Sequence, residues 1–104
     1  MDLKIEGGGP LKIGGSSNSP DLQWATIDIF FKNADNDHSY TATAEILIPK
    51  RGDITFAEMQ DIARKKAALL FRKAADALDS HSIAELEALS DALISNLGHI
   101  PELP

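Results

Sequence analysis

Two stretches of alternating sequence, residues 22–32 and 39–48, constrain the fold of this chain more than any other feature. Both are rich in β-branched and aromatic residues, and apolar side chains recur at every second position. A polar segment of six residues, 33–38, separates them, and Pro49 follows the second stretch. The pattern predicts an antiparallel β-hairpin, because two such strands joined by a short polar turn can pair directly.

The period of two assigns each side chain of this hairpin to one of two faces. If Phe31 lies opposite Tyr40, large and small apolar residues oppose each other on one face, which leaves room for a helix to lie close. The residues of that face are Ala25, Ile27, Ile29, Phe31, Tyr40, Ala42, Ala44, Ile46 and Ile48. The other face is mostly polar, but it carries Trp24, Phe30 and Leu47, with Trp24 directly across from Leu47.

The first twenty residues are rich in glycine and serine, and we expect them to be partly flexible. Residues 3–6 alternate apolar and polar side chains and predict a short edge strand, and residues 11–13 form a second short candidate. This N-terminal segment is the expected cover for the apolar residues on the polar face of the hairpin.

The first predicted helix covers about residues 56–78 and begins at a capping box formed by Thr55 and Glu58. The apolar residues that share one arc of this helix are Phe56, Met59, Ala63, Ala67, Leu70, Phe71, Ala74, Ala77 and Leu78. Ile62 and Leu69 fall outside that arc, among basic residues. They could pack under a second helix, meet a second copy of the chain, or meet a foreign protein.

The second predicted helix covers about residues 83–97 and begins at another capping box, formed by Ser82 and Glu85. Continued as one helix with the first, its apolar arc would be rotated by roughly 130°. A turn near residues 79–81 is therefore expected. The order of elements predicts an α+β fold: a small antiparallel sheet of three or four strands, then two helices packed on one face, in a single domain over residues 1–104.

The formal net charge of −6 is concentrated at one end of the 104 residues. Residues 1–73 contain ten acidic and ten basic side chains, whereas residues 74–104 contain six acidic side chains and no basic one. There is no cysteine, which excludes disulfides, thiolate nucleophiles and cysteine-based metal centres. No apolar run is long enough for a membrane span, and we expect a cytoplasmic location.

Chemical motifs are weak throughout the sequence. The glycine-rich start lacks a P-loop lysine, since Gly15 stands at that position, and residues 35–38 fit a hairpin turn better than a calcium loop. The histidines, His38, His81 and His99, have no metal-binding or catalytic spacing. We therefore expect no catalytic residue, no cofactor and no metal, and the chain is not predicted to be an enzyme.

The apolar residues left over from the predicted core point to a protein-interaction module, such as an adaptor, an inhibitor or a small subunit. The candidate partner surface consists of Trp24, Phe30, Leu47, Ile62 and Leu69. We expect a protein partner, including a second copy of the chain in a homodimer, and no membrane partner.

Two alternatives use charge instead of apolar surface. The first is a nucleic-acid-binding regulator that uses basic residues of the first helix, namely Arg64, Lys65, Lys66, Arg72 and Lys73. Its phosphate contacts are disfavoured by nearby acidic residues at ion-pair spacing, so nucleic acid is an unlikely partner. The second is an acidic decoy of nucleic acid that uses Glu85, Glu87 and Asp91.

Overall fold

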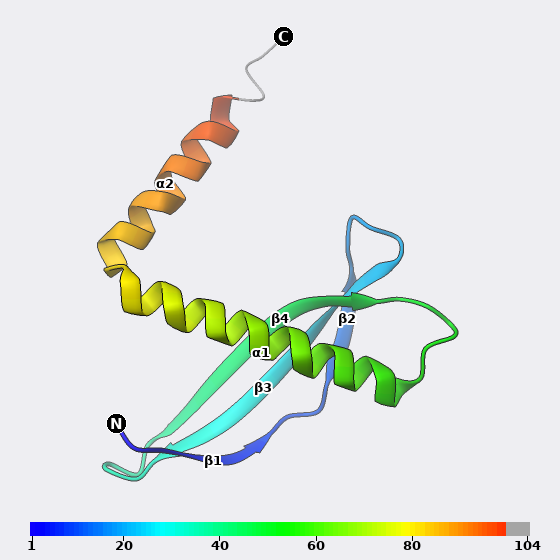
Figure 1. Cartoon of the computed structure of the whole chain (residues 1–104), viewed down its shortest axis with the longest axis horizontal. Helices are drawn as coiled ribbons and strands as arrows, with labels where there is room; N and C mark the ends of the chain where they lie inside the picture. Colours follow the sequence, from blue (N-terminus) through cyan, green and yellow to red (C-terminus); the bar gives the residue numbers. More distant parts are fainter. Residues whose placement is uncertain (100–104) are drawn as a thin grey trace. The chain divides into compact units, whose positions relative to one another are not determined.

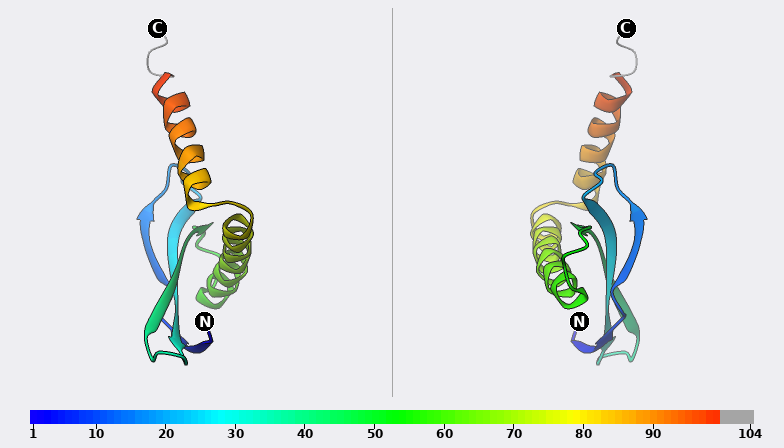
Figure 2. Two further views of the ribbon diagram at one scale, coloured as in Figure 1. Left: turned by 90° about the vertical axis from the view of Figure 1, so that its left-hand side faces the viewer. Right: turned by 90° about the vertical axis from the view of Figure 1, so that its right-hand side faces the viewer.

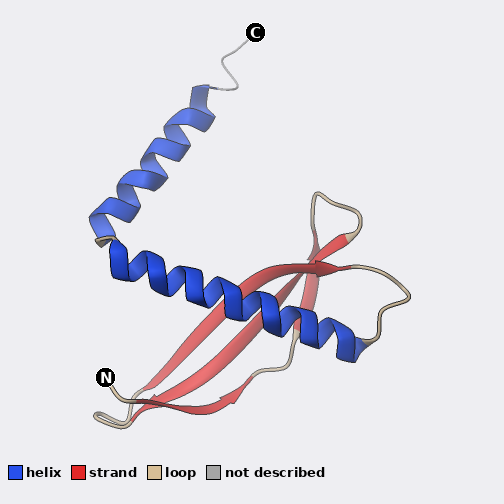
Figure 3. Ribbon diagram, viewed as in Figure 1, coloured by secondary structure: helices blue, strands red, loops and turns tan. Residues whose placement is uncertain are grey.

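A computed structural model describes residues 1–99 and shows a four-stranded antiparallel sheet followed by two helices, which is an α+β fold (Figures 1 and 3). The elements are β1 Leu3–Gly8, β2 Lys12–Ser16, β3 Leu22–Asn33, β4 Ser39–Pro49, α1 Phe56–Ser80 and α2 Ile83–His99. By its internal contacts the chain divides into two compact units, residues 1–71 and the residues from 72 onward. The expectation of a single domain stays a prediction.

The hairpin of β3 and β4 forms in the predicted register. Phe31 lies opposite Tyr40 and Trp24 lies opposite Leu47, and the pairing runs without a bulge from one end of β4 to the other. The connecting turn is closed where the Asn33 backbone N–H donates to the His38 carbonyl at 2.8 Å. This pairing keeps the predicted apolar residues of both strands together on one face, as the period of two requires.

β1 and β2 together form the other edge of the sheet. β1 pairs with the C-terminal half of β3 and β2 pairs with its N-terminal half, and each ladder contains an irregularity. Between the two strands, the Gly9 N–H still donates to the Asp28 carbonyl at 3.1 Å. The two short segments predicted from the sequence are therefore strands, and both extend further than expected, to Gly8 and Ser16.

The core of the first unit lies between the sheet and the first part of α1, which runs along one face of the strands (Figure 2). Its buried residues are Ala25, Ala44, Ile46 and Ile48 from the strands and Ala63 and Ala67 from α1. We call this side of the sheet the inner face. Small residues therefore supply both surfaces of this core, with alanine from the helix and alanine and isoleucine from the strands.

The buried arc of α1 differs in part from the predicted one. Ala63 and Ala67 are buried, but Phe56 and Leu70 are 52% and 42% exposed. Ile62, which the helical period placed outside the arc, packs against the core. A helical wheel shows which side of a helix is apolar, but burial also requires a strand beneath each residue, and the narrow sheet does not supply one everywhere.

The second unit contains the end of α1, the turn and α2. α1 ends at Ser80 and α2 begins at Ile83, so the break that the phase argument required is present. The capping box is reciprocal: the Ser82 N–H donates to Glu85 Oε1 at 2.9 Å, and the Glu85 N–H donates to Ser82 Oγ at 3.1 Å. These hydrogen bonds to Ser82 lower the pKa of Glu85. Of the predicted arc of α2, the side chains of Ile94 and Leu97 lie outside what the structure describes.

No helix within residues 1–99 combines the length and apolarity that crossing a lipid bilayer would require.

Candidate partner surface on the sheet

The side of the sheet opposite α1, which we call the outer face, carries the large apolar residues that the core does not use. Its residues are Trp24, Thr26, Asp28 and Phe30 on β3 and Thr41, Thr43, Glu45 and Leu47 on β4. Trp24 and Phe30 are 41% and 39% exposed. They lie six positions apart on one strand, which separates them by about 20 Å. The outer face therefore presents two aromatic side chains at the ends of a polar strip.

Two glycines, Gly15 in β2 and Gly9 between β1 and β2, explain why both aromatic residues stay accessible. A Cβ atom at Gly15 would lie 3.8 Å from Trp24 Cδ1, and a Cβ atom at Gly9 would lie 3.8 Å from Phe30 Cζ. The rings thus lie beside backbone that has no side chain to cover them. The N-terminal segment borders these residues, as expected, but covers them only in part.

Trp24 separates two shallow depressions of about 250 Å³ each. One is lined by Gly14, Thr26 and Glu45, and the other by Ser17, Asn18, Ser19 and Leu47. The β2–β3 loop that forms the second rim is held by Ser17, whose Oγ lies 2.7 Å from the Ser19 carbonyl and 2.9 Å from the Leu22 carbonyl. The indole therefore stands between two hollows that complementary side chains could enter.

Asp28 occupies the middle of the outer face, and its charge is already partnered. Thr43 Oγ1 donates to Asp28 Oδ1 at 2.7 Å, and Lys12 Nζ lies 3.5 Å from Oδ2. The hydrogen bond from Thr43 is the main cause that lowers the pKa of Asp28, with a further contribution from Lys12. The carboxylate is thus held in its ionised form, with its side chain 15% exposed.

The structure gathers three of the five predicted surface residues and separates the other two. Trp24, Phe30 and Leu47 share the outer face. Ile62 lies on the inner face, half-buried against the core. Leu69 is 54% exposed on α1 and does not belong to the outer face.

Three of the five basic residues of α1 are engaged within the chain. Asp61 accepts from both Arg64, at 2.9 Å, and Lys65, at 3.0 Å. Lys66 Nζ donates to the Leu47 carbonyl at 2.7 Å. These contacts reduce the cationic surface that α1 could offer to a phosphate backbone, although exposed ion pairs are individually weak.

The described part of the chain contains one close contact between a serine and a histidine, and it lacks the geometry of a nucleophile and its base. Ser80 Oγ lies 3.0 Å from His81 Nδ1, but the same hydroxyl donates to the Asp76 carbonyl at 2.7 Å. His81 Nδ1 lies 3.1 Å from the Ala77 carbonyl, which can only accept a hydrogen bond. Nδ1 therefore carries the proton and cannot take one from the serine. Within residues 1–99, no cluster of three His, Asp or Glu side chains is placed to hold a metal ion.

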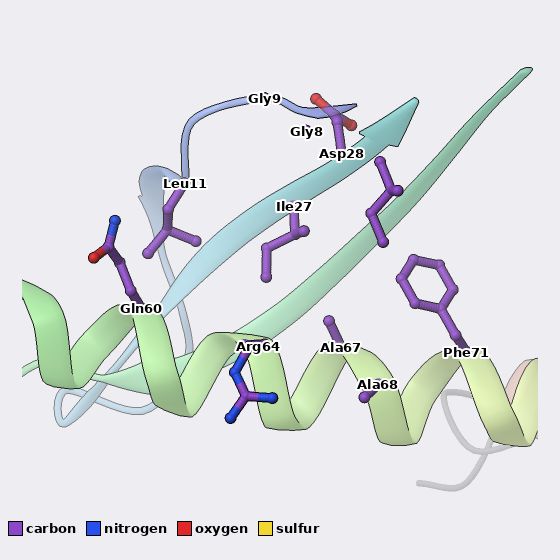
Figure 4. Close-up of a pocket in the computed structure, with 11 residues that line it drawn as sticks. Gly8, Gly9, Leu11, Ile27, Asp28, Gln60, Arg64, Ala67, Ala68 and Phe71 are labelled. Carbon is purple, nitrogen blue, oxygen red and sulfur yellow. The ribbon is translucent and has the colours of Figure 1, made fainter. Parts of the chain in front are cut away.

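A cavity of about 400 Å³, which the sequence did not predict, lies where α1 passes the gap between β1 and β2 (Figure 4). Its lining includes Gly8, Gly9, Leu11, Ile27, Ala67 and Phe71. Leu11 and Ile27 point toward α1, whereas the Asp28 side chain points away from it (Figure 4). Arg64 borders the cavity but binds Asp61 on its own helix. The signal that could have revealed the cavity is the run of glycines at 7–9, which leaves the edge strand without side chains.

Comparison of the chain with protein-family models, curated proteins and solved structures found no match. The site is therefore interpreted from its own geometry and chemistry.

Proposed function

We propose that this chain is a non-enzymatic protein-interaction module whose partner binds the outer face of the sheet around Trp24, Phe30 and Leu47. The observation that carries the proposal is the placement of Trp24 and Phe30, each about two-fifths exposed, on the face that α1 does not use. Aromatic side chains are enriched in protein interfaces, and tryptophan is enriched among the residues that dominate binding energy.

The polar strip between the aromatic residues supports the same function. Thr26, Thr43 and Glu45 offer hydroxyl and carboxylate groups for hydrogen bonds across an interface. The charge of Asp28 is already partnered by Thr43 and Lys12, so burying it under a partner would cost less than burying a free carboxylate. Two apolar anchors around a partly satisfied polar centre are suited to a protein surface.

Nucleic-acid binding remains the second candidate, and the engaged side chains of Arg64, Lys65 and Lys66 argue against it. The two functions respond differently to salt. Phosphate contacts would make the affinity for nucleic acid fall steeply as salt rises, whereas an interface anchored by Trp24 and Phe30 would depend weakly on salt.

Affinity purification with immobilised wild-type chain and two outer-face variants tests the proposal. Trp24→Ser and Phe30→Ser each remove one aromatic anchor, and Ile5→Ser serves as the matched control. Ile5 is an exposed apolar residue of the same sheet that pairs with Phe31 and so belongs to the inner face. We expect a protein that is retained by the wild type and the control and lost from both outer-face variants.

The retained protein would then be purified and titrated against the chain, with the fluorescence of Trp24 as the readout, because this is the only tryptophan. A change in emission on binding would support contact at the outer face. Equal retention by all variants, provided that their circular dichroism matches the wild type, would contradict the proposed surface.

A further inference from the structure

The two edges of the sheet differ in how well they are protected against pairing with another chain. The β1–β2 edge is interrupted by two irregular pairings and by Pro10. β4 pairs with β3 alone among the described strands, and its ladder has no bulge. Proteins usually block a free edge with proline, lysine, bulges or short strands, and residues 39–46 contain none of these devices.

Backbone groups of β4 point alternately toward β3 and toward the open edge. Just before β4, the His38 carbonyl accepts from Asn33 of β3 at 2.8 Å. Just after it, the Lys50 N–H donates to the Asp21 carbonyl at 2.7 Å. Both positions are even-numbered, and the register between them is unbroken. The even-numbered residues of β4 therefore bond to β3, and the odd-numbered residues direct their N–H and C=O groups to the open edge.

Lys66 confirms this assignment and limits the open stretch. Its Nζ atom donates to the carbonyl of Leu47, an odd-numbered residue, from the side of β4 away from β3. The edge is thus capped at Leu47 and open over the preceding positions. The odd-numbered residues of the open stretch are Ser39, Thr41, Thr43 and Glu45, and all of them are exposed.

An exposed leucine lies on the flank of α1 that borders this edge. Leu69 follows Lys66 by three residues and so lies on the same flank of the helix. The opposite flank, which includes Gln60, Arg64 and Ala68, borders the cavity near β1 and β2. Leu69 is 54% exposed within the part of the chain that the structure describes.

We infer that a second copy of this chain binds along the open edge of β4, with the two β4 strands antiparallel and the two sheets joined into one. The antiparallel arrangement is two-fold symmetric, as most homodimers are. It places the α1 helices of both copies on the same face of the joined sheet, with their Leu69 flanks toward each other. The inference goes beyond the proposed function, because it adds the edge of β4 as a second interaction surface beside the outer face.

The sequence of the edge is self-complementary in one register. The open stretch, residues 39–45, has its midpoint at Ala42. Pairing about that midpoint sets Thr41 opposite Thr43 of the second copy, a combination that forms favourable cross-strand contacts. It sets Tyr40 opposite Ala44, a large residue against a small one. Glu45, the only charged residue of β4, lies opposite Ser39 and not opposite its own copy, so like charges do not meet.

Hydrogen exchange measured at low and high protein concentration tests the inference at individual backbone groups. The amides of Ala42 and Ala44 bond to β3 and should exchange slowly at both concentrations. The amides of Thr41, Thr43 and Glu45 should exchange rapidly in the monomer and at least about tenfold more slowly when the dimer forms. Light scattering on the same samples should show the change from monomer to dimer.

Substitutions test whether the edge of β4, and not another surface, forms the dimer interface. Thr41→Pro removes an N–H that β3 does not use, so the hairpin should form and the dimer should be lost. Thr41→Lys is the milder second variant, in case proline disturbs folding. Leu69→Glu should raise the dimer dissociation constant about tenfold or more, while Leu78→Glu, which changes another exposed leucine of α1, should leave it unchanged.

Three results would overturn the inference: a monomer at concentrations up to about 1 mM, a dimer in which Thr41 and Thr43 stay unprotected, or a folded Thr41 variant that dimerises like the wild type. The proposed function fails separately. Trp24→Ser should leave dimerisation intact, and Leu69→Glu, which lies on α1 and not on the outer face, should leave binding of an outer-face partner intact. A dimer lost in Trp24→Ser but kept at wild-type strength in Leu69→Glu would place self-association on the outer face and remove it from β4.

Discussion

The two faces of the sheet use the same two strands for opposite purposes. The inner face buries small and β-branched residues, with Ala44 and Ile48 completely inaccessible. The outer face carries the larger side chains of Trp24 and Phe30 and leaves both partly exposed. In a fold limited only by burial of apolar area, the largest side chains would be expected in the core.

This difference shows that the core is built from small and β-branched residues and not from the largest side chains. Ala25 and Ala44 of the sheet and Ala63 and Ala67 of the helix all belong to one buried cluster. The aromatic residues are left for a surface where glycine-rich edge strands keep them accessible. Their role in the isolated chain is therefore smaller than their size suggests.

The largest expected difference in stability is between alanine substitutions at Ile48 and Leu47, neighbouring residues that point to opposite faces of the sheet. Ile48→Ala should lower the free energy of unfolding by about 2 to 5 kcal/mol, because it leaves a cavity in the core. Leu47→Ala should cost clearly less, since that side chain is only half-buried on the outer face. Urea denaturation of both variants measures the difference. Equal losses would show that the outer face contributes to the core as much as the inner face does.

Substitutions that enlarge a side chain should also destabilise the inner face more than the outer face, but by less than the Ile48→Ala substitution. Ala44→Leu should cost about 1 to 3 kcal/mol, because Ala44 is fully buried and the added atoms would displace the residues packed around it. Thr41→Leu places the same side chain on the outer face and should change stability by no more than about 0.5 kcal/mol. Thermal unfolding at a concentration that keeps the chain monomeric measures both. An Ala44→Leu variant as stable as the wild type would show that the core has room for a larger side chain at this position.

The smallest expected effect concerns the pH dependence of the outer face. The pKa of Asp28 is lowered below its usual value of 3.8, chiefly by the hydrogen bond from Thr43. The unfolded state then binds more protons than the native state just below that value. The stability that Asp28 contributes is therefore fully present above about pH 4 and is lost as the pH falls through the lowered pKa.

Urea midpoints measured from about pH 2 to pH 6 should rise less with pH in Asp28→Asn than in the wild type. Thr43→Val is the matched variant, because it removes the hydroxyl and keeps the carboxylate. Its pH dependence should lie between the other two. If the wild-type curve coincides with that of Asp28→Asn, the ionisation of Asp28 makes no pH-dependent contribution to the stability of the protein.

The sequence predicted the two faces of the hairpin and both helix starts because these features depend on neighbouring residues. Alternation over β3 and β4 predicted which residues share a face, and Glu58 and Glu85 marked helix starts within one turn of their caps. The candidate site was predicted in part. Trp24, Phe30 and Leu47 were grouped correctly because they share one strand pair. The positions of Ile62 and Leu69 depend on where α1 crosses the sheet, which no local pattern encodes.

By itself, the sequence determined the α+β order of elements, the two faces of the hairpin and the absence of cysteine chemistry, since each follows from composition or short-range periodicity. Tertiary structure alone decided how β1 and β2 share an edge, which flank of α1 covers the strands, and where Lys66 caps β4. These features arise from contacts between residues far apart in the chain. Their geometry depends on how these distant segments pack against one another, which no short-range pattern encodes.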